Sequence, residues 1–177
     1  MAWSTPATAT AGSILTAAIW NASVRDNLLE TAAAKATTAG SHFASTATNT
    51  LAERITTESE VATQETTTST SYTDLATGGP TVTVTTGTKA LVLIHGALKS
   101  SVSGTSVFMS VAVTGASAIA ADDGHAVRMA LTEFQEATAH NFFTTLTAGS
   151  NIFTAKYKIG AAGTLTAANR RVTVIPF

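Results

Sequence analysis

Short stretches of alternating apolar and polar residues dominate the last two thirds of the chain. Thr81–Thr85 alternates strictly, and Val107–Val113 places its larger apolar residues on one face. Ala90–Leu98 is almost continuously apolar, which is typical of a central strand covered on both faces. A two-residue period predicts β-strands. Strands this short, separated by turn signals such as the Gly-Gly-Pro at 78–80, predict a mainly β chain with an antiparallel β-sandwich of the jelly-roll type.

The C-terminal stretch predicts three more strands. Asn141 to Lys158 has the pattern of one strand, a tight turn and a second strand, so we expect a hairpin. Gly160 to Thr166 follows as a loop, and Asn169 to Phe177 has the pattern of a last strand. Because the sequence ends within that pattern, we expect the C-terminal residues to belong to the sheet.

The beginning of the chain follows a helical period instead. Thr16 is a suitable N-cap residue, and good helix formers continue from Ala17 to Lys35. Trp20, Val24 and Leu28 recur at i, i+4 and i+8, which predicts one apolar stripe on a short amphipathic helix. This helix has no partner within its own segment. We expect it to dock on the β-body, on sister subunits or on another protein.

These patterns divide the chain into three parts. Residues 1–38 form an extended N-terminal arm with the short helix, 39–61 a Thr- and Ala-rich connector, and 62–177 the β-sandwich head. The connector is expected to be extended, with one helical turn at Leu51 to Ile55. It is either a flexible tether or an ordered strap laid over a neighbouring molecule.

Composition narrows the possible functions. The net charge of the 177 residues is −1 and charged residues make up 12%, about half the usual share. This removes the electrostatic case for binding nucleic acid, which requires a basic face. No apolar run approaches the roughly 18 residues that span a bilayer. The N-terminus has no signal-peptide pattern, which predicts synthesis in a cytoplasm. There is no cysteine, and thus no disulfide, zinc-thiolate or thiol chemistry.

Few residues suggest chemistry. Asp122, Asp123 and His125 lie within four positions and have the ligand types of a divalent-cation site, but an Asp-Gly pair more often makes a solvated turn. Glu133 and Glu136 fit a charged connecting segment better than a glycosidase pair. No nucleophile elbow, phosphate loop or zinc motif is present. The sequence therefore predicts no enzyme, no cofactor and no metal site.

Three polar residues fall within strand patterns. His95 interrupts an apolar strand, and is either a hydrogen-bonded core histidine or an interface residue. Arg170 and Arg171 are adjacent on the last strand, so they point to opposite faces. One of them then points inward or into a subunit interface and needs a carboxylate or carbonyl partner, unless the strand is an edge from which both reach solvent. His95, Arg170 and Arg171 are our candidates for a trimer interface.

Two stretches resemble structural proteins of tailed bacteriophages. WSTP at 3–6, GSILTAAIWN at 12–21 and VRDNL at 24–28 resemble an N-terminal segment of those proteins, which has the form W-x-T-P, G-x-x-L-T-A-A, N and V-R-D-N-L. Residues 146–176 resemble the closing strands of trimeric jelly-roll heads in phage fibre and capsid decoration proteins. Such heads are similar in architecture to the tumour-necrosis-factor and C1q group.

The resemblance implies an arm that anchors to a virion and a head that trimerises. The sequence has no long collagen-like or coiled-coil shaft, which favours a homotrimeric capsid decoration (cement) protein bound to the major capsid protein. The anchoring residues are then apolar ones of the arm and helix: Trp3, Ile14, Leu15, Trp20, Val24 and Leu28. The alternative is a minor tail or fibre protein that contacts the host surface through head loops 116–124 and 161–168.

Overall fold

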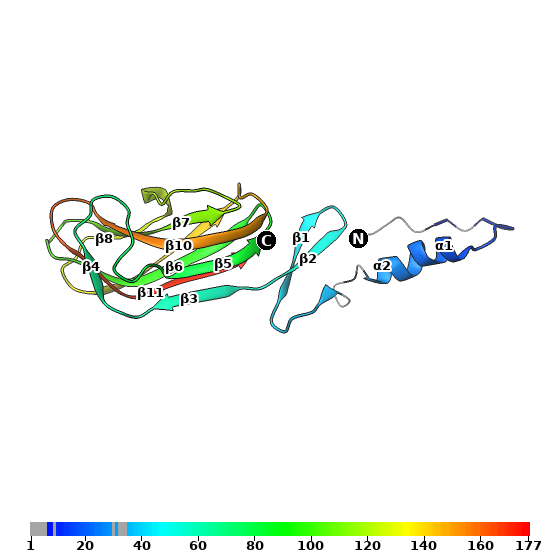
Figure 1. Ribbon diagram of the computed structural model, residues 1–177, viewed down its shortest axis with the longest axis horizontal. Coiled ribbons are helices and arrows are strands. Elements are labelled where there is room, and N and C mark those ends of the chain that lie inside the picture. Colours follow the sequence, from blue (N-terminus) through cyan, green and yellow to red (C-terminus); the bar gives the residue numbers. More distant parts are fainter. Residues whose placement is uncertain (1–6, 9, 30, 32–34) are drawn as a thin grey trace. The chain divides into compact units, whose positions relative to one another are not determined.

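The computed structural model describes residues 7–8, 10–29, 31 and 35–177. The chain forms two compact units (Figure 1). The first comprises Met1–Ile55 together with Phe177, and the second comprises Thr56–Pro176. The unit boundary thus lies inside the segment 39–61 that the sequence suggested as a connector.

The second unit, the head, is an antiparallel sandwich of two sheets. Its strands are β3 (Thr57–Val61), β4 (Glu65–Thr67), β5 (Thr81–Thr86), β6 (Ala90–Ser100), β7 (Val107–Gly115), β8 (Val127–Met129), β9 (Gln135–Phe143), β10 (Gly149–Ile159) and β11 (Leu165–Pro176). One sheet has the order β5-β10-β7-β8 and the other β3-β11-β6-β9, with β4 also paired to β11. If β3 and β4 count as one interrupted strand, the orders are 2-7-4-5 and 1-8-3-6, which is a jelly roll of two Greek keys. The predicted fold class is confirmed.

The core lies between the facing sides of the two sheets. Along β10, every second side chain from Asn151 to Ile159 is buried, which is the two-residue period expected for a strand with one inward face. Phe153 and Tyr157 from this strand are fully buried, as are Val92 and Ile94 from β6. Each large apolar side chain buried in this way contributes about 1.5–3 kcal/mol of transfer free energy.

The hairpin predicted for 141–158 is wrong. β9 pairs with β6, whereas β10 pairs with β5 and β7, so the two consecutive strands belong to different sheets. Residues 144–148 cross from one sheet to the other. A strand-turn-strand pattern specifies the strands but not their partners, because pairing in a Greek key is decided by contacts distant in sequence.

The last strand, β11, lies between β6 on one side and β3 with β4 on the other. Its register shifts between Ala168 and Arg171, where Asn169 adopts a positive φ of 49°. This bulge sets which of the two following arginines points inward. As expected from the sequence pattern, the strand continues to Pro176, close to the end of the chain.

The first unit contains the helical segment. It consists of α1 (Ala17–Trp20), a π-helical turn (Asn21–Arg25) and α2 (Asp26–Leu29). The predicted cap is confirmed, because the Thr16 side chain accepts a hydrogen bond from the Ile19 N–H at 3.3 Å. The predicted continuation of the helix through Glu30 and 32–34 lies outside the described residues.

A β-hairpin of the first unit follows the helical segment. It comprises β1 (His42–Ala47) and β2 (Thr50–Arg54), joined by a turn in which Asn49 has a positive φ of 57°. The helical turn expected at 51–55 is therefore wrong, because residues 51–54 pair across the hairpin. The Glu53 carboxylate accepts hydrogen bonds from Ser41 Oγ at 2.6 Å and from the Thr38 N–H at 2.8 Å. The Ser41 bond, with those from Thr37 and Thr38, lowers the pKa of Glu53 to about 2.

Candidate anchoring segment and head surface

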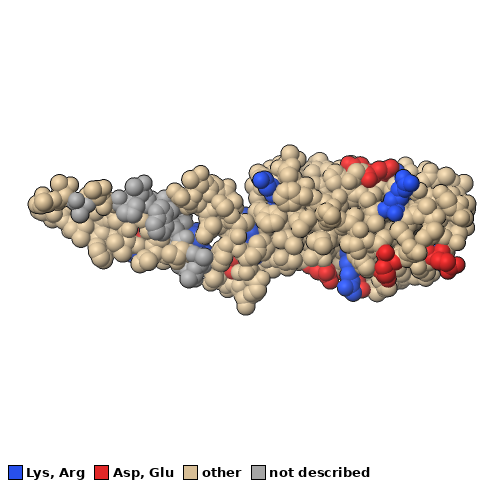
Figure 2. Space-filling view, turned by 180° about the vertical axis from the view of Figure 1, so that it is seen from behind, with Lys and Arg blue, Asp and Glu red and all other residues tan. Residues whose placement is uncertain are grey.

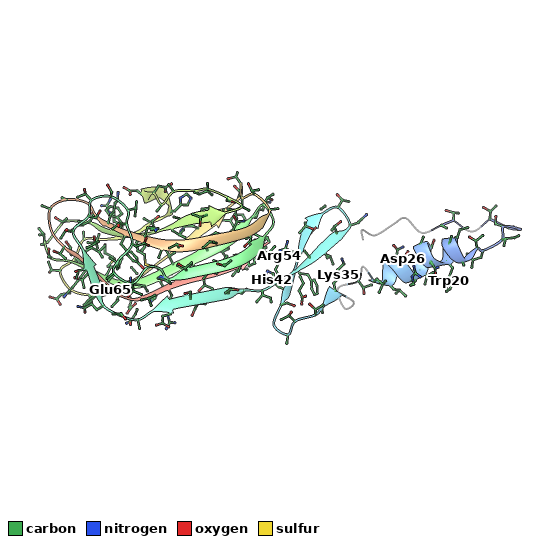
Figure 3. The ribbon with its side chains drawn as sticks, viewed as in Figure 1. Trp20, Asp26, Lys35, His42, Arg54 and Glu65 are labelled. Atoms are coloured by element: carbon green, nitrogen blue, oxygen red, sulfur yellow. The ribbon has the colours of Figure 1, made fainter. Side chains whose placement is uncertain are left out.

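The segment from Ile14 to Leu29, here called the anchoring segment, exposes large apolar side chains. Trp20 is 52% exposed and Leu28 61% exposed, and Figure 3 shows Trp20 projecting from the helix. The full set with at least 39% exposure is Ile14, Leu15, Ile19, Trp20, Leu28 and Leu29. Among the predicted anchoring residues, Val24 is half-buried, and Trp3 lies outside the described residues.

Polar residues occupy the covered side of this helix. Asn27 is buried, and its Nδ2 donates to the Ser23 backbone oxygen at 3.2 Å. The Ser23 hydroxyl oxygen in turn accepts from the Ala7 N–H at 3.0 Å, so the chain before the helix folds back against this side. The helix therefore turns a polar side toward its own chain and leaves its apolar residues exposed. Large exposed apolar side chains that gather on one segment are typical of an interaction site.

Charge contributes little to the anchoring segment. Arg25 and Asp26 pair with one another at 2.8 Å, and in the view of Figure 2 the coloured charged atoms gather mainly on the head. The exposed surface of the segment thus favours apolar contact over electrostatic attraction. No helix within the described ranges is long and apolar enough to cross a membrane.

His95 and Arg171 lie on the outer face of the β3-β11-β6-β9 sheet. Arg171 stands opposite His95 and pairs with Glu60 at 3.0 Å. His95 Nε2 contacts Glu136 Oε2 at 2.7 Å, and its Nδ1 contacts Thr138 Oγ1 at 3.0 Å. These side chains form a polar row across the four strands, and both predicted residues keep an exposed fraction that a neighbouring molecule can contact.

Arg170 points the other way, into the head. Its side chain has no exposed surface, and its Nη2 donates to Glu65 Oε2 at 3.0 Å and to the Thr63 backbone oxygen at 3.2 Å. Its guanidinium lies 5.4 Å from the centre of the Tyr157 ring. A fully buried side chain cannot contact another subunit, so Arg170 is removed from the trimer-interface candidates. The sequence predicted an inward arginine with a carboxylate or carbonyl partner as one of its two alternatives, and Arg170 has both kinds of partner.

The partner of Arg170 is itself held by hydroxyl and amide groups. Glu65, which Figure 3 labels in the head, accepts hydrogen bonds from the Thr77 hydroxyl at 2.6 Å and the Thr77 N–H at 2.9 Å. The Thr77 hydroxyl, and to a smaller degree the positive charge of Arg170, hold the pKa of Glu65 below its ordinary value. The cluster joins β4, the segment before β5, and β11.

The Asp-Asp-Gly-His stretch at 122–125 forms a short 3-10 turn. Asp122 Oδ1 accepts from the His125 N–H at 3.0 Å and contacts the ring Nδ1 at 2.9 Å. The His125 ring stacks on Phe143 with 4.8 Å between ring centres. Asp123 turns outward instead, toward residues of β10 and the segment before β5. The geometry agrees with the turn interpretation of this motif.

Comparisons with known proteins concern the fold only. Neither a protein-family model nor a curated protein matches the chain. The chain is similar to a chain in the structure of infectious bursal disease virus, Gx strain, at 12% identity over 71% of this chain and 34% of that chain, with a TM-score of 0.42. It is also similar to murine APRIL, at 10% identity over 66% of this chain and 100% of that one, with a TM-score of 0.34. The chain thus spans about a third of the length of the viral chain, and likenesses at this level leave its function open.

Proposed function

We propose that the chain is a non-enzymatic structural component of a bacteriophage virion, a homotrimeric capsid decoration protein that binds the major capsid protein and stabilises the head shell. The observation that carries the proposal is the anchoring segment, because its apolar side chains are exposed while its polar side is covered. The resemblance of residues 3–28 to an N-terminal segment of phage structural proteins supports the class of partner. The jelly-roll head supports the comparison with decoration proteins.

The anchoring segment supplies enough apolar surface for docking. Complete burial of a large apolar side chain contributes about 1.5–3 kcal/mol. Because Trp20 and Leu28 are 52% and 61% exposed, each has about 1 kcal/mol still to gain on binding. Three arms attached to one trimer bind with an avidity that exceeds the affinity of a single arm.

Substitutions on the anchoring segment test the proposal. A full-length variant with Trp20→Ser, Leu28→Ser and Leu29→Ser loses about 3 kcal/mol of apolar contact, which predicts roughly 100-fold weaker binding per arm to capsids stripped of this protein. The matched control is Val102→Ser with Leu131→Ser, since these head residues are 45% and 46% exposed. Co-sedimentation with capsids measures the binding of both variants. Equal binding of the two variants would contradict the proposed anchor.

The trimer is tested by mass in solution. Native mass spectrometry is expected to give three times the 18.0 kDa of one chain. The interface is proposed to include the outer face with His95 and Arg171, where both side chains are partly exposed. Arg171→Glu is then expected to shift the mass toward the monomer, whereas an unchanged trimer would exclude this face.

A minor tail or fibre protein is the second candidate function. The loop after β7, which would contact the host surface in that role, receives Tyr72 from a distant part of the chain through a hydrogen bond to Asp123. Quantitative mass spectrometry of virions separates the two candidates. Hundreds of copies per particle favour decoration, and a handful of copies favours the tail.

A further inference from the structure

An open groove of about 520 Å³ lies on the outer face of the β5-β10-β7-β8 sheet. Lys156 and Lys158 of β10 and Ala112 of β7 line its floor, with Tyr72 on one wall and Ala120 on the other. Its volume falls within the range of about 300–1,000 Å³ that is typical of small-molecule sites. None of its lining residues belongs to the anchoring segment or to the polar row with His95.

Backbone hydrogen bonds hold both walls of the groove in place. On one side, Thr73 and Tyr157 exchange two N–H···O bonds of 3.0 and 2.9 Å, which pairs the segment before β5 with β10 and presents Tyr72 outward. On the other side, Val113 and Ile119 exchange two bonds of 2.8 and 2.9 Å, which folds the loop after β7 back over the sheet. The groove is therefore built into the head rather than formed by loose side chains.

Two of the lining side chains, Tyr72 and Lys158, belong to a polar cluster. The Tyr72 hydroxyl donates to Asp123 Oδ1 at 2.9 Å, and Lys158 Nζ pairs with the same oxygen at 2.6 Å. The Lys158 ammonium also lies 4.8 Å from the Tyr72 ring centre and 4.7 Å from that of Phe108. Bonds from Lys158 and Tyr72 hold the pKa of Asp123 below its ordinary value, so Asp123 stays ionised at neutral pH.

The charges around the groove cancel. Lys156 Nζ pairs with Asp74 Oδ2 at 2.7 Å, as Lys158 does with Asp123, so two cations face two carboxylates. An ammonium group has three donors and a carboxylate has several acceptor positions, so each paired group keeps capacity for a ligand. An anion would find no surplus positive charge. A neutral molecule with many hydroxyl groups matches a surface that offers donors and acceptors in balance.

We propose that this groove binds a neutral saccharide of one or two sugar units, with ligand hydroxyls accepting from Lys156 and Lys158, whose charges are balanced by their partners Asp74 and Asp123. The small side chains of Ala112 and Ala120 leave room for the ring. This site is independent of the proposed anchoring function, since it lies on the head and uses other residues.

Saturation-transfer NMR on the full-length protein tests the site. The probes are glucose, galactose, mannose, N-acetylglucosamine, maltose and lactose at millimolar concentration, with sialyllactose and inorganic phosphate as anionic probes. We expect at least one neutral sugar to give a saturable signal, and the anions to give none that competes with it. If no neutral sugar binds, or if only the anions bind, the proposal is overturned.

Two variants place any binding in the groove. Ala120→Trp fills it without removing a polar group, and Ala118→Trp is the matched control, because Ala118 is an exposed residue of the same loop that does not line the groove. Lys156→Ala removes one charge-assisted hydrogen bond and is expected to weaken binding about tenfold or more. Loss of sugar binding in Ala120→Trp and weaker sugar binding in Lys156→Ala, with unchanged binding in Ala118→Trp, support the site. Equal sugar signals in all variants overturn the proposed site. Capsid binding by Ala120→Trp is measured separately, because it tests the anchoring segment and not the groove.

Discussion

Replacement of Asn151 by alanine is expected to destabilise the head by about 2–4 kcal/mol. Asn151 is fully buried at the start of β10, and its amide joins three separate segments. Its Oδ1 accepts from the Ser117 N–H at 2.8 Å, and its Nδ2 donates to Thr86 Oγ1 at 2.8 Å and to the Thr147 backbone oxygen at 3.0 Å. The residue thus fixes the end of β5, the turn after β7 and the crossing between the sheets.

The magnitude follows from what the alanine variant leaves unpaired. The Ser117 N–H lies in a buried residue and loses the only partner described for it, which costs about 1–3 kcal/mol. The Thr86 hydroxyl keeps its bond to the Gly87 backbone oxygen at 2.8 Å, and Thr147 is exposed, so these two groups lose less. Lost side-chain packing adds to the cost.

Asn151→Asp distinguishes hydrogen bonding from packing, because it keeps the shape of the side chain. One carboxylate oxygen still accepts from Ser117, but the other faces three oxygen atoms that previously accepted from Nδ2, those of Thr86, Thr147 and Gly149. Burial and these contacts raise the aspartate pKa above its unfolded value near 3.9. The destabilisation is therefore present at neutral pH and diminishes as the pH falls through the raised folded pKa.

Chemical denaturation followed by far-UV circular dichroism measures these effects. Both tryptophans lie in the first unit, so tryptophan fluorescence does not report on the head. Ser150→Ala, an exposed neighbour, is the control and is expected to stay within about 0.5 kcal/mol of the unmodified protein. The reasoning is refuted if Asn151→Ala behaves like this control, or if the deficit of Asn151→Asp is the same at neutral and acidic pH.

Three further predictions concern other described contacts. Glu65→Gln is expected to destabilise the head more than Arg170→Met, because it leaves a buried cation without its counter-charge. Since folding lowers the Glu65 pKa, the stability lost in Glu65→Gln is greatest above the ordinary glutamate pKa and shrinks as the pH falls below that value. Thermal melts at several pH values measure both effects. Glu53→Gln is expected to speed hydrogen exchange of the Thr38 N–H, because this group donates to the Glu53 carboxylate. In the unmodified protein, the protection of the Thr38 N–H from exchange is expected to fade as the pH falls from about 4.5 toward the Glu53 pKa of about 2. Gly115→Ala is expected to cost about 1–3 kcal/mol in denaturation experiments, because Gly115 has a φ of 93° and an added Cβ would lie 2.5 Å from a backbone oxygen of β10; an unchanged midpoint would contradict this.

The strands of the head were predictable where burial alternates along the chain. β5, β6 and β7 each appear in the sequence as a period-two or continuous apolar run, because one or both of their faces meet the core. Their partners were not predictable to the same degree. β9 and β10 follow one another with a turn signal between them, yet each completes a different sheet, and nothing in the local residues separates that arrangement from a hairpin.

Prediction of the candidate functional residues from the sequence has the same limit. Adjacent positions required Arg170 and Arg171 to point to opposite faces, but the bulge at Asn169 decides which one enters the core, and the partner Glu65 lies far away in the sequence. Helical spacing predicted an apolar stripe of Trp20, Val24 and Leu28, of which Trp20 and Leu28 are exposed and Val24 is half-buried. The groove beside Tyr72 was not predictable, because Tyr72 reaches its wall only through the long-range pairing of Thr73 with Tyr157.

Under the proposed function the chain is a phage virion protein, and cryo-electron microscopy of those virions tests this central claim most directly. The proposed function predicts jelly-roll heads in groups of three on the outer surface of the capsid. It also predicts density for the anchoring segment, with Trp20 and Leu28 buried against major capsid subunits. Capsids without this density, or heads found only on the tail, would contradict it.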